Sequence, residues 1–242
     1  MSFIKSLLHS LLRKCGYDIL RYNLNNFISV RRKIILGQTK VDLVIDIGAH
    51  DGSYGAELRH SGYKKRIISF EPLTVAFNIL KDRCFNDLLW SCSNRAIGNF
   101  NGKSTLNVSG NYPSSSLLKM TKEHIRSLPT SSIKSQELVE VVTLDSLLNE
   151  LKLGQYRIYL KLDVQGYERI VLDGAVEVIK YVKVIEIELS LVKLYDDSPI
   201  YYEMISYLRS LGFHLVSITP GFSDPDTGYL LQVDGIFVRK TA

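Results

Sequence analysis

The chain has 242 residues and a net charge of +5, with 45% hydrophobic, 23% charged and 10% aromatic residues. This ordinary globular composition excludes a disordered, collagen-like or disulfide-stapled chain, and a chain of this length can bury one sizeable core. Three cysteines without C-x-x-C spacing (Cys15, Cys84 and Cys92) argue against a zinc knuckle and favour a reducing, cytoplasmic setting.

Positive charge is concentrated in the first 40 residues, which hold eight of the 30 basic side chains but only one acid, Asp18. The rest of the chain is close to neutral. Because this body lacks a basic face, an enzyme that tracks a nucleic-acid backbone is not expected. We therefore divide the chain into a basic N-terminal helical arm, residues 1–40, and one domain, residues 41–242.

Apolar residues recur at helical spacing in the first half of this arm: Phe3, Ile4, Leu7, Leu8, Leu11 and Leu12. They predict a short amphipathic helix that ends near Gly16, because glycine commonly follows a helix end. Two interpretations of its apolar face stay open. Either residues 1–21 form a peripheral contact with an anionic membrane surface, or the helix packs on the core or on the second subunit of a homodimer.

After residue 40, apolar strand-like runs alternate with helical patterns. Strands are expected at 41–47, 66–70, 88–97, 105–108, 138–142, 156–162, 183–189, 214–219 and 233–238. Helices are expected at 52–61, 73–83, 166–180 and 199–211 and from residue 143, with a long loop at 109–136. The alternation predicts an α/β fold with a mostly parallel, Rossmann-like sheet, to which the closing hairpin adds an antiparallel strand.

The motif VIDIGAHDG, residues 44–52, joins the first strand to the first helix of the domain through a glycine turn. Gly48 and Gly52 let the backbone turn tightly and let a ligand approach it. Asp46 and Asp51 flank the turn, and Glu71 follows Gly52 by 19 residues, at the end of the second strand. An acid at that place accepts hydrogen bonds from ribose hydroxyls in nucleotide sites of this design.

Two cofactors compete for this layout. A dinucleotide requires a G-x-G-x-x-G turn, whereas the turn here is G-x-x-x-G, and its two carboxylates would repel a pyrophosphate. The same carboxylates suit the sulfonium and ammonium groups of S-adenosylmethionine, which is the cofactor that we expect. A plain strand-to-helix turn would explain the glycines but not Glu71.

The motifs VIDIGAHDGSYGAEL, SFEP, NRAIGNFNGKSTLNV, SSSLL, VTLDSLL and KLDVQGYERIVLDGA follow one another along the chain. In this order they resemble the FkbM-type S-adenosylmethionine-dependent methyltransferases over roughly residues 41–240. The resemblance implies a class I methyltransferase fold with a seven-stranded sheet, and methyl transfer to a hydroxyl, as in sugar and polyketide O-methyltransferases.

The same resemblance implies where the cofactor binds. It places the methionine end at Asp46, Gly48, Asp51 and Gly52, the ribose at Glu71 and the adenine beside Asn94. In the surrounding wall we expect Ala49, His50, Pro72 and Ala96.

Methylation of an alcohol requires removal of its proton, and a carboxylate beside the acceptor can serve as general base. Asp163, at the end of the fourth strand of the parallel series, is the expected base, and capping of the next helix is its alternative role. Lys161 leaves the same face of that strand and is expected to pair with an acid. Where the family pattern is D-x-E-G, this chain has Gln165 in place of the acid.

Glu186 and Glu188 alternate along a strand that should be buried, so each carboxylate needs a partner. Glu188 and Lys161 are the other candidate catalytic residues near the acceptor. For these acids, a salt bridge with Lys161 or Lys183 is favoured over a Mg²⁺ ion held by Asp163, Glu188 and Asp234.

Together these features predict a single-domain O-methyltransferase that acts on a hydroxyl, of a sugar in a glycolipid, a surface polysaccharide or a secondary metabolite. It is expected in the cytoplasm, with the arm as a contact to the cytoplasmic membrane face. Two alternatives stay open: a non-catalytic, methyltransferase-like binding protein, and an N-methyltransferase on a small molecule or protein. No Asn-Pro-Pro-Tyr sequence follows the fourth strand, which argues against methylation of a nucleic-acid base.

Overall fold

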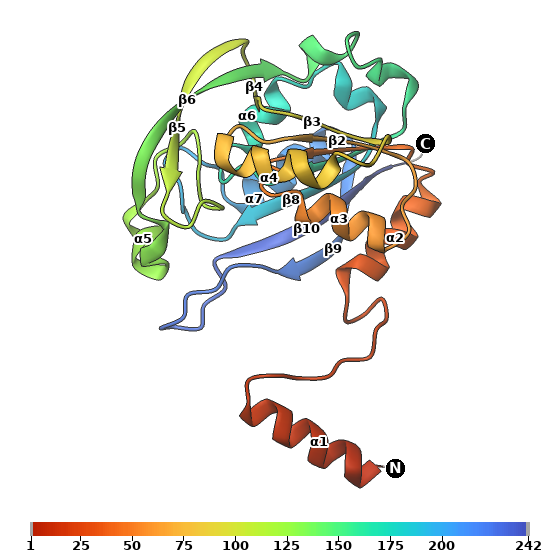
Figure 1. Ribbon diagram of the computed structural model, residues 1–242, viewed down its shortest axis with the longest axis vertical. Helices are drawn as coiled ribbons and strands as arrows, with labels where there is room; N and C mark the ends of the chain where they lie inside the picture. The colour runs from red at the N-terminus through yellow and green to blue at the C-terminus, as the bar shows by residue number, and fades with distance from the viewer. Residues whose placement is uncertain (1, 241–242) are drawn as a thin grey trace.

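The computed structural model of the chain describes residues 2–240 and has a seven-stranded sheet at its centre (Figure 1). In sheet order the strands are β3 (Trp90–Ser93), β2 (Arg66–Phe70), β1 (Leu43–Ile47), β7 (Ile158–Leu162), β8 (Val182–Ser190), β10 (Gln232–Arg239) and β9 (Phe213–Pro220). Neighbours pair in parallel from β3 to β8, and β10 is antiparallel to both β8 and β9. The α/β class I methyltransferase fold predicted from the sequence is therefore confirmed. Because strand order reverses between β1 and β7, their carboxyl ends frame the crevice where such sheets bind ligands.

Helices cover both faces of this sheet: α2 (Ile28–Gln38), α3 (Ser53–His60), α4 (Thr74–Cys84), α6 (Glu168–Asp173) and α7 (Tyr201–Ser210). Side chains alternate between the two faces along each strand. Leu43, Ile45 and Ile47 of β1 belong to one buried cluster, with residues of α6 and α7. Val44 belongs to a second cluster, with residues of α2, α3 and α4. All five residues of β1 are buried, as expected at the centre of a parallel sheet.

A second sheet of three strands lies beside the first, in the order β4 (Ala96–Gly98), β6 (Ile133–Thr143) and β5 (Gly102–Ser109). The single strand expected at 88–97 is therefore wrong, because the chain leaves the main sheet after Ser93 and β4 joins the small one. The loop expected at 109–136 is also shorter than expected. It contains the short helix α5 (Lys122–Ser127) and the first residues of β6.

The helix expected over 166–180 is interrupted where the small sheet packs on it. Gly174 lies against Gly98 of β4, and an added Cβ would come 2.0 Å from the Gly98 carbonyl oxygen. α6 ends just before this contact, and only a 3-10 turn follows, at Val178–Tyr181. The helix expected from residue 143 is likewise reduced to a 3-10 turn, Asp145–Leu147.

The N-terminal helix α1 (Ser2–Lys14) forms as predicted but lies apart from the body (Figure 1). Leu7, Leu8 and Leu11 expose 54%, 46% and 54% of their surface, so the leucine face does not pack on the core. The rest of the arm behaves differently, because α2 packs on the domain through the buried Arg32 and Leu36. None of the helices in residues 2–240 is long and apolar enough to span a bilayer.

Candidate functional site

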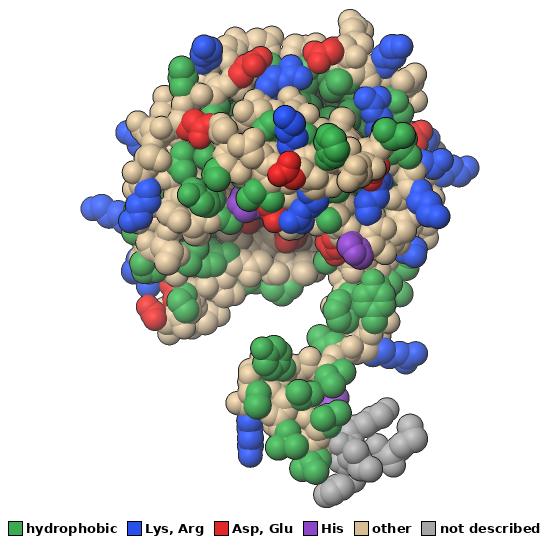
Figure 2. Space-filling model, viewed as in Figure 1, with side chains coloured by type: hydrophobic (Ala, Val, Ile, Leu, Met, Phe, Trp, Pro, Cys, Tyr) green, Lys and Arg blue, Asp and Glu red, His purple; other side chains and the backbone are tan. Residues whose placement is uncertain are grey.

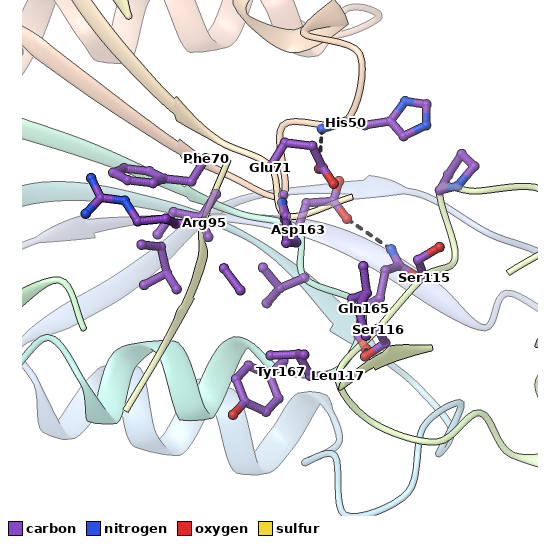
Figure 3. Close-up of a pocket in the computed structure, with 18 of the residues that line it drawn as sticks. His50, Phe70, Glu71, Arg95, Ser115, Ser116, Leu117, Asp163, Gln165 and Tyr167 are labelled. Atoms are coloured by element: carbon purple, nitrogen blue, oxygen red, sulfur yellow. Dashed lines mark hydrogen bonds between the residues drawn. The ribbon is translucent and has the colours of Figure 1, made fainter. Parts of the chain in front are cut away.

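A cavity of about 310 Å³ lies at the carboxyl ends of β1, β2 and β7 (Figure 3). This volume is within the range of small-molecule sites. Of the residues expected at the site, those that line the cavity are Gly48, His50, Glu71, Pro72, Ala96, Asp163 and Glu188. The structure thus brings the glycine turn, the end of β2 and the candidate base to one cavity.

Gly48 brings the glycine turn against the end of β7. Its φ is +78°, in the left-handed region, and an added Cβ would lie 1.8 Å from the carbonyl oxygen of Asp163. The Asp163 amide also donates a hydrogen bond to the carbonyl oxygen of Ile47. Since no other residue fits this contact, Gly48 fixes the distance between the turn and the candidate base.

Glu71 reaches the cavity from the end of β2. Its carboxylate accepts hydrogen bonds from the amides of His50 and Leu73, each at 2.8 Å (Figure 3 shows the bond from His50). The net pKa of Glu71 is raised to about 7. Burial is the largest cause and the charges of Asp46 and Asp163 add to it, whereas the hydrogen bonds from the two amides partly offset it. Each carboxylate oxygen keeps a second lone pair, so Glu71 can still accept hydroxyl donors from a ligand.

The two aspartates that flank the glycine turn do not line the cavity. Asp46 is buried beneath it, where the hydroxyl of Ser69 donates to its carboxylate at 3.2 Å, and burial raises the pKa of Asp46 to about 7. Asp51 turns to the outside, where its carboxylate pairs with Arg83 at 2.9 Å and accepts from the amide of Ser53 at 3.0 Å. The carboxylates in the wall are therefore not these two but those of Glu71, Asp163 and Glu188.

Three other expected cofactor residues also lie outside the wall: Ala49, Gly52 and Asn94. Ala49 is buried in the core cluster beneath α3. Gly52 begins α3 with a φ of +83°, and an added Cβ would come 2.8 Å from the side chain of Leu80. The Asn94 amide donates to the carbonyl oxygens of Glu71 and Pro72, each at 2.9 Å. These residues shape the turn and hold the strand ends in place.

Lys161 is buried between two carboxylates at the end of β7. Its ammonium lies 3.3 Å from Asp163 and 3.7 Å from Asp234. Burial alone would lower the pKa of Lys161, but these carboxylates outweigh it and raise the pKa above its usual range. Lys161 therefore stays charged and holds Asp163, whose side chain is 39% exposed, at the cavity. The expected pairing of Lys161 with an acid is found.

Gln165 joins Asp163 to Glu188. Its amide nitrogen lies 3.0 Å from a carboxylate oxygen of each, and its amide oxygen accepts from the hydroxyl of Tyr195 at 2.6 Å (Figure 3 shows the bond to Asp163). Burial raises the pKa of Glu188 well above its usual range, and Asp163 and Glu168 raise it further. A third carboxylate in place of Gln165 would add repulsion here, whereas the amide donates to both acids.

A metal ion was the less favoured alternative for Asp163, Glu188 and Asp234. Within the described part of the chain, no group of three or more His, Cys, Asp or Glu side chains is arranged to hold a metal. The charge that lies between Asp163 and Asp234 is the ammonium of Lys161.

Glu186 does not reach the cavity, and its partner is not a strand lysine. Arg32 of α2 binds its two carboxylate oxygens at 2.8 and 2.7 Å, and the hydroxyls of Tyr54 and Tyr159 donate to the same group. The arginine lies 154 residues away in the sequence, and no local pattern links it to Glu186.

The opposite wall of the cavity comes from the small sheet and its loop, where Ala96 is the one expected cofactor residue. The residues there are Arg95, Ile97, Leu106, Tyr112, Pro113, Ser115, Ser116 and Leu117. Of the serines in the SSSLL motif, Ser115 and Ser116 line the cavity and Ser114 does not. Two signals point to this segment in the sequence: the length of 109–136, since long loops in compact domains are usually functional, and the hydroxyls of these serines, for which a plain polar loop was the favoured interpretation.

Comparisons with solved structures give weak similarities. PH1948 of Pyrococcus horikoshii is 11% identical, with a TM-score of 0.46 over 88% of this chain and 84% of that one. The precorrin-6y C5,15-methyltransferase of Geobacter metallireducens is 12% identical, with a TM-score of 0.43 over 92% and 94%. Fibrillarin of Aeropyrum pernix, solved with natively bound S-adenosylmethionine, is 12% identical, with a TM-score of 0.41 over 81% and 66%. Similarity at this level carries no argument about the reaction.

No curated protein sequence matches the chain. A model of the methyltransferase FkbM domain does match it, over residues 46–215. The match begins at Asp46, in the strand before the glycine turn, and covers the end of β2, the small sheet and Asp163. Since it spans more than half of the chain, and includes the motifs that form the cavity, the chain belongs to the FkbM family of S-adenosylmethionine-dependent methyltransferases.

Proposed function

We propose that this methyltransferase acts on a hydroxyl group, of a sugar in a glycolipid, a surface polysaccharide or a secondary metabolite. The observation that carries the proposal is the position of Asp163. Its carboxylate lines the cavity, is partly exposed, and is held by Lys161 and Gln165. A hydroxyl acceptor must lose its proton as its oxygen attacks, and a fixed carboxylate can both orient the hydroxyl and accept that proton.

The residues of the cavity fit the cofactor. S-adenosylmethionine supplies an electrophilic methyl group on a positively charged sulfur. Of the acids in its wall, Asp163 and, above its pKa of about 7, Glu71 give the cavity the negative charge that suits this cation. Glu71 would accept hydrogen bonds from the ribose hydroxyls. Because Gly48 has no side chain, the cofactor could approach the backbone of the turn closely.

Two carboxylates beside the acceptor site differ in their environments. Asp163 is partly exposed and lies beside a lysine, whereas Glu188 is buried and its pKa is raised well above the usual range. Such a difference separates the roles of acid and base in other enzymes. We assign Asp163 to the acceptor hydroxyl and the proton that it loses, while the buried Glu188 behind it keeps its own proton and helps to hold the Gln165 amide that orients Asp163.

The experiment that tests the acceptor class is a comparison of cell glycans with and without the protein by mass spectrometry. A gain of one CH₂ unit on a sugar oxygen, dependent on the protein, supports the proposal. Methylation only on nitrogen, with glycans unchanged, would overturn it, since Asp163 would then have no proton of an alcohol to remove.

The affinity for S-adenosylhomocysteine is expected to rise with pH between 6 and 8. Below its pKa of about 7 Glu71 carries a proton and is a poorer acceptor for ribose hydroxyls, so about a tenfold gain is expected as this proton is lost. Glu71→Gln should bind more weakly and show little dependence on pH. Calorimetric titration at several pH values measures both.

Glu168→Gln is the matched control for this experiment. Glu168 is also buried, its pKa is also raised to about 7 by burial, and it also accepts two backbone amides, those of Val164 and Gly166. It does not line the cavity. The pH dependence should therefore survive in Glu168→Gln, and its survival in Glu71→Gln would refute the assignment of Glu71.

A further inference from the structure

The segment 2–24 exposes apolar side chains along α1 and along the chain that follows it. On α1 these are the half-exposed Leu7, Leu8 and Leu11. The chain that follows exposes Tyr17, Ile19, Leu20, Tyr22 and Leu24 by 49–70%. Figure 2 shows hydrophobic side chains gathered over α1 and over the connection to the body. A 13-residue helix is marginal in water by itself, so this helix is expected to rest on a surface.

The other face of α1 is polar, and the only acid of the arm, which follows the helix in the chain, lies against it. Asp18 folds back on this face, where its carboxylate pairs with Arg13 at 2.9 Å and lies 2.9 Å from Nδ1 of His9. The hydrogen bond from Arg13 lowers the pKa of Asp18, with a further contribution from His9. By helical spacing, His9 and Arg13 lie opposite the leucines. The acid is thus neutralised locally and kept away from the apolar face.

The remaining charges of this segment are positive. Lys14 and Arg21 are exposed and have no acidic partner within 4.0 Å among the described residues. Apolar side chains bordered by unpaired cations are complementary to anionic phospholipid headgroups with acyl chains beneath them. A second copy of the chain would bring the same cations together, so charge favours a bilayer over a dimer.

We propose that residues 2–24 bind the surface of an anionic bilayer. α1 lies in the plane of the interface, with Leu7, Leu8 and Leu11 toward the acyl chains and Lys14 and Arg21 at the headgroups. The segment binds without spanning, because no described helix is long and apolar enough to cross. This binding does not depend on which acceptor the enzyme methylates.

Co-sedimentation of the full chain with vesicles tests the proposal. Vesicles of phosphatidylcholine with phosphatidylglycerol should bind at least about tenfold more protein than phosphatidylcholine alone, because two or more basic residues contribute. Binding to the anionic vesicles should fall about tenfold in high salt, where the headgroup charge is screened. Equal binding to both vesicle types, or none to either, would overturn the proposal.

Two variants separate the apolar and the charged contributions. Leu7→Ser combined with Leu8→Ser and Leu11→Ser should weaken vesicle binding at least about tenfold, since buried apolar area drives insertion. Lys14→Gln with Arg21→Gln leaves the leucines intact and should remove most of the preference for anionic lipid. Neither should change the affinity for S-adenosylhomocysteine, because neither alters the cavity.

The matched control for the leucine variant removes three other exposed apolar side chains, those of Phe85, Leu88 and Leu138, each replaced by Ser. They expose 79%, 103% and 66% of their surface and all lie on the body. Vesicle binding should be unchanged in this control. If it falls as far as in the leucine variant, or if the leucines instead support a dimer seen by sedimentation velocity without vesicle binding, the proposal is wrong.

Discussion

Replacing Asp163 by Asn is expected to lower the turnover of this methyltransferase by about 10²–10⁴, the usual contribution of a general base. The amide has nearly the shape of the carboxylate, and its single oxygen can still accept from one of the two donors, Lys161 or Gln165, which lie 3.3 and 3.0 Å away. It cannot accept the proton of a hydroxyl. Affinity for S-adenosylhomocysteine should change little, because Glu71 and the glycine turn stay intact. Single-turnover kinetics of product formation measure the loss of turnover, and calorimetry measures the affinity for S-adenosylhomocysteine separately.

Asp173→Asn is the matched control for this variant. The side chain of Asp173 has the same 39% exposure and is also ion-paired, with Arg169 at 2.9 Å, but it lies at the end of α6 and outside the cavity. Its replacement should leave turnover unchanged. Normal turnover in Asp163→Asn would remove Asp163 from the role of base, and a large loss of cofactor affinity would place it in the cofactor site instead.

The parts of the fold that local pattern determines could be predicted from the sequence. β1 and β7 are short, mostly apolar runs that are buried along their whole length, and β2 is found at the residues expected, 66–70. The glycine turn is also determined by the local sequence, because glycine is the residue that readily adopts the left-handed φ found at Gly48. The predicted secondary structure is wrong where tertiary packing determines it. The segment 88–97 is apolar enough for one strand, and only the small sheet makes it two.

The candidate site shows the same division. Gly48, Glu71 and Asp163 follow from motif spacing and strand ends, and all three line the cavity. The negative charge was expected at Asp46 and Asp51, but the first is buried and the second faces Arg83. Spacing along the chain says that a side chain is near a turn, and it does not say which way that side chain points.

Pairings between distant segments are the hardest to predict. The network of Gln165, Glu188 and Tyr195 depends on how a loop after β7 meets a strand and a second loop. Seen from the sequence, Gln165 is a departure from a family pattern. In the structure it is an amide that donates to two carboxylates at once, a role that only the assembled site reveals.

A large loss of stability is expected when Arg32 is replaced. From the charge distribution alone, Arg32 would be expected to lie exposed on the basic arm. Its side chain is 5% exposed, and its guanidinium binds Glu186 through two hydrogen bonds. Arg32→Met keeps the apolar volume but leaves a buried carboxylate without its cation, which costs about 3–5 kcal/mol. For a chain of this length the midpoint of thermal unfolding should fall by about 10 °C. Calorimetric or circular-dichroism melts measure it.

Lys33→Met, on the exposed side of the same helix, is the control. Its melting temperature should stay within about two degrees of that of the native chain, because exposed substitutions usually change stability little. The double variant Arg32→Met with Glu186→Gln removes both charges and keeps an acceptor oxygen for the hydroxyls of Tyr54 and Tyr159. It should recover most of the lost stability, because no unpaired charge stays buried. A double variant that is as unstable as Arg32→Met would show that packing of α2, and not the unpaired carboxylate, causes the loss.

The pH dependence of stability also distinguishes the unpaired carboxylate from a packing defect. Burial alone would raise the pKa of Glu186, but Arg32 outweighs it and lowers the pKa to about 2. In the native chain this group therefore stabilises the fold above the usual pKa of a glutamate, and that contribution is lost only as the pH falls toward 2. Without Arg32 the buried carboxyl keeps its proton to higher pH, so its folded pKa is raised and stability is lost as the pH rises. The deficit of Arg32→Met should accordingly be larger at pH 8 than at pH 5, whereas a packing defect would cost the same at both.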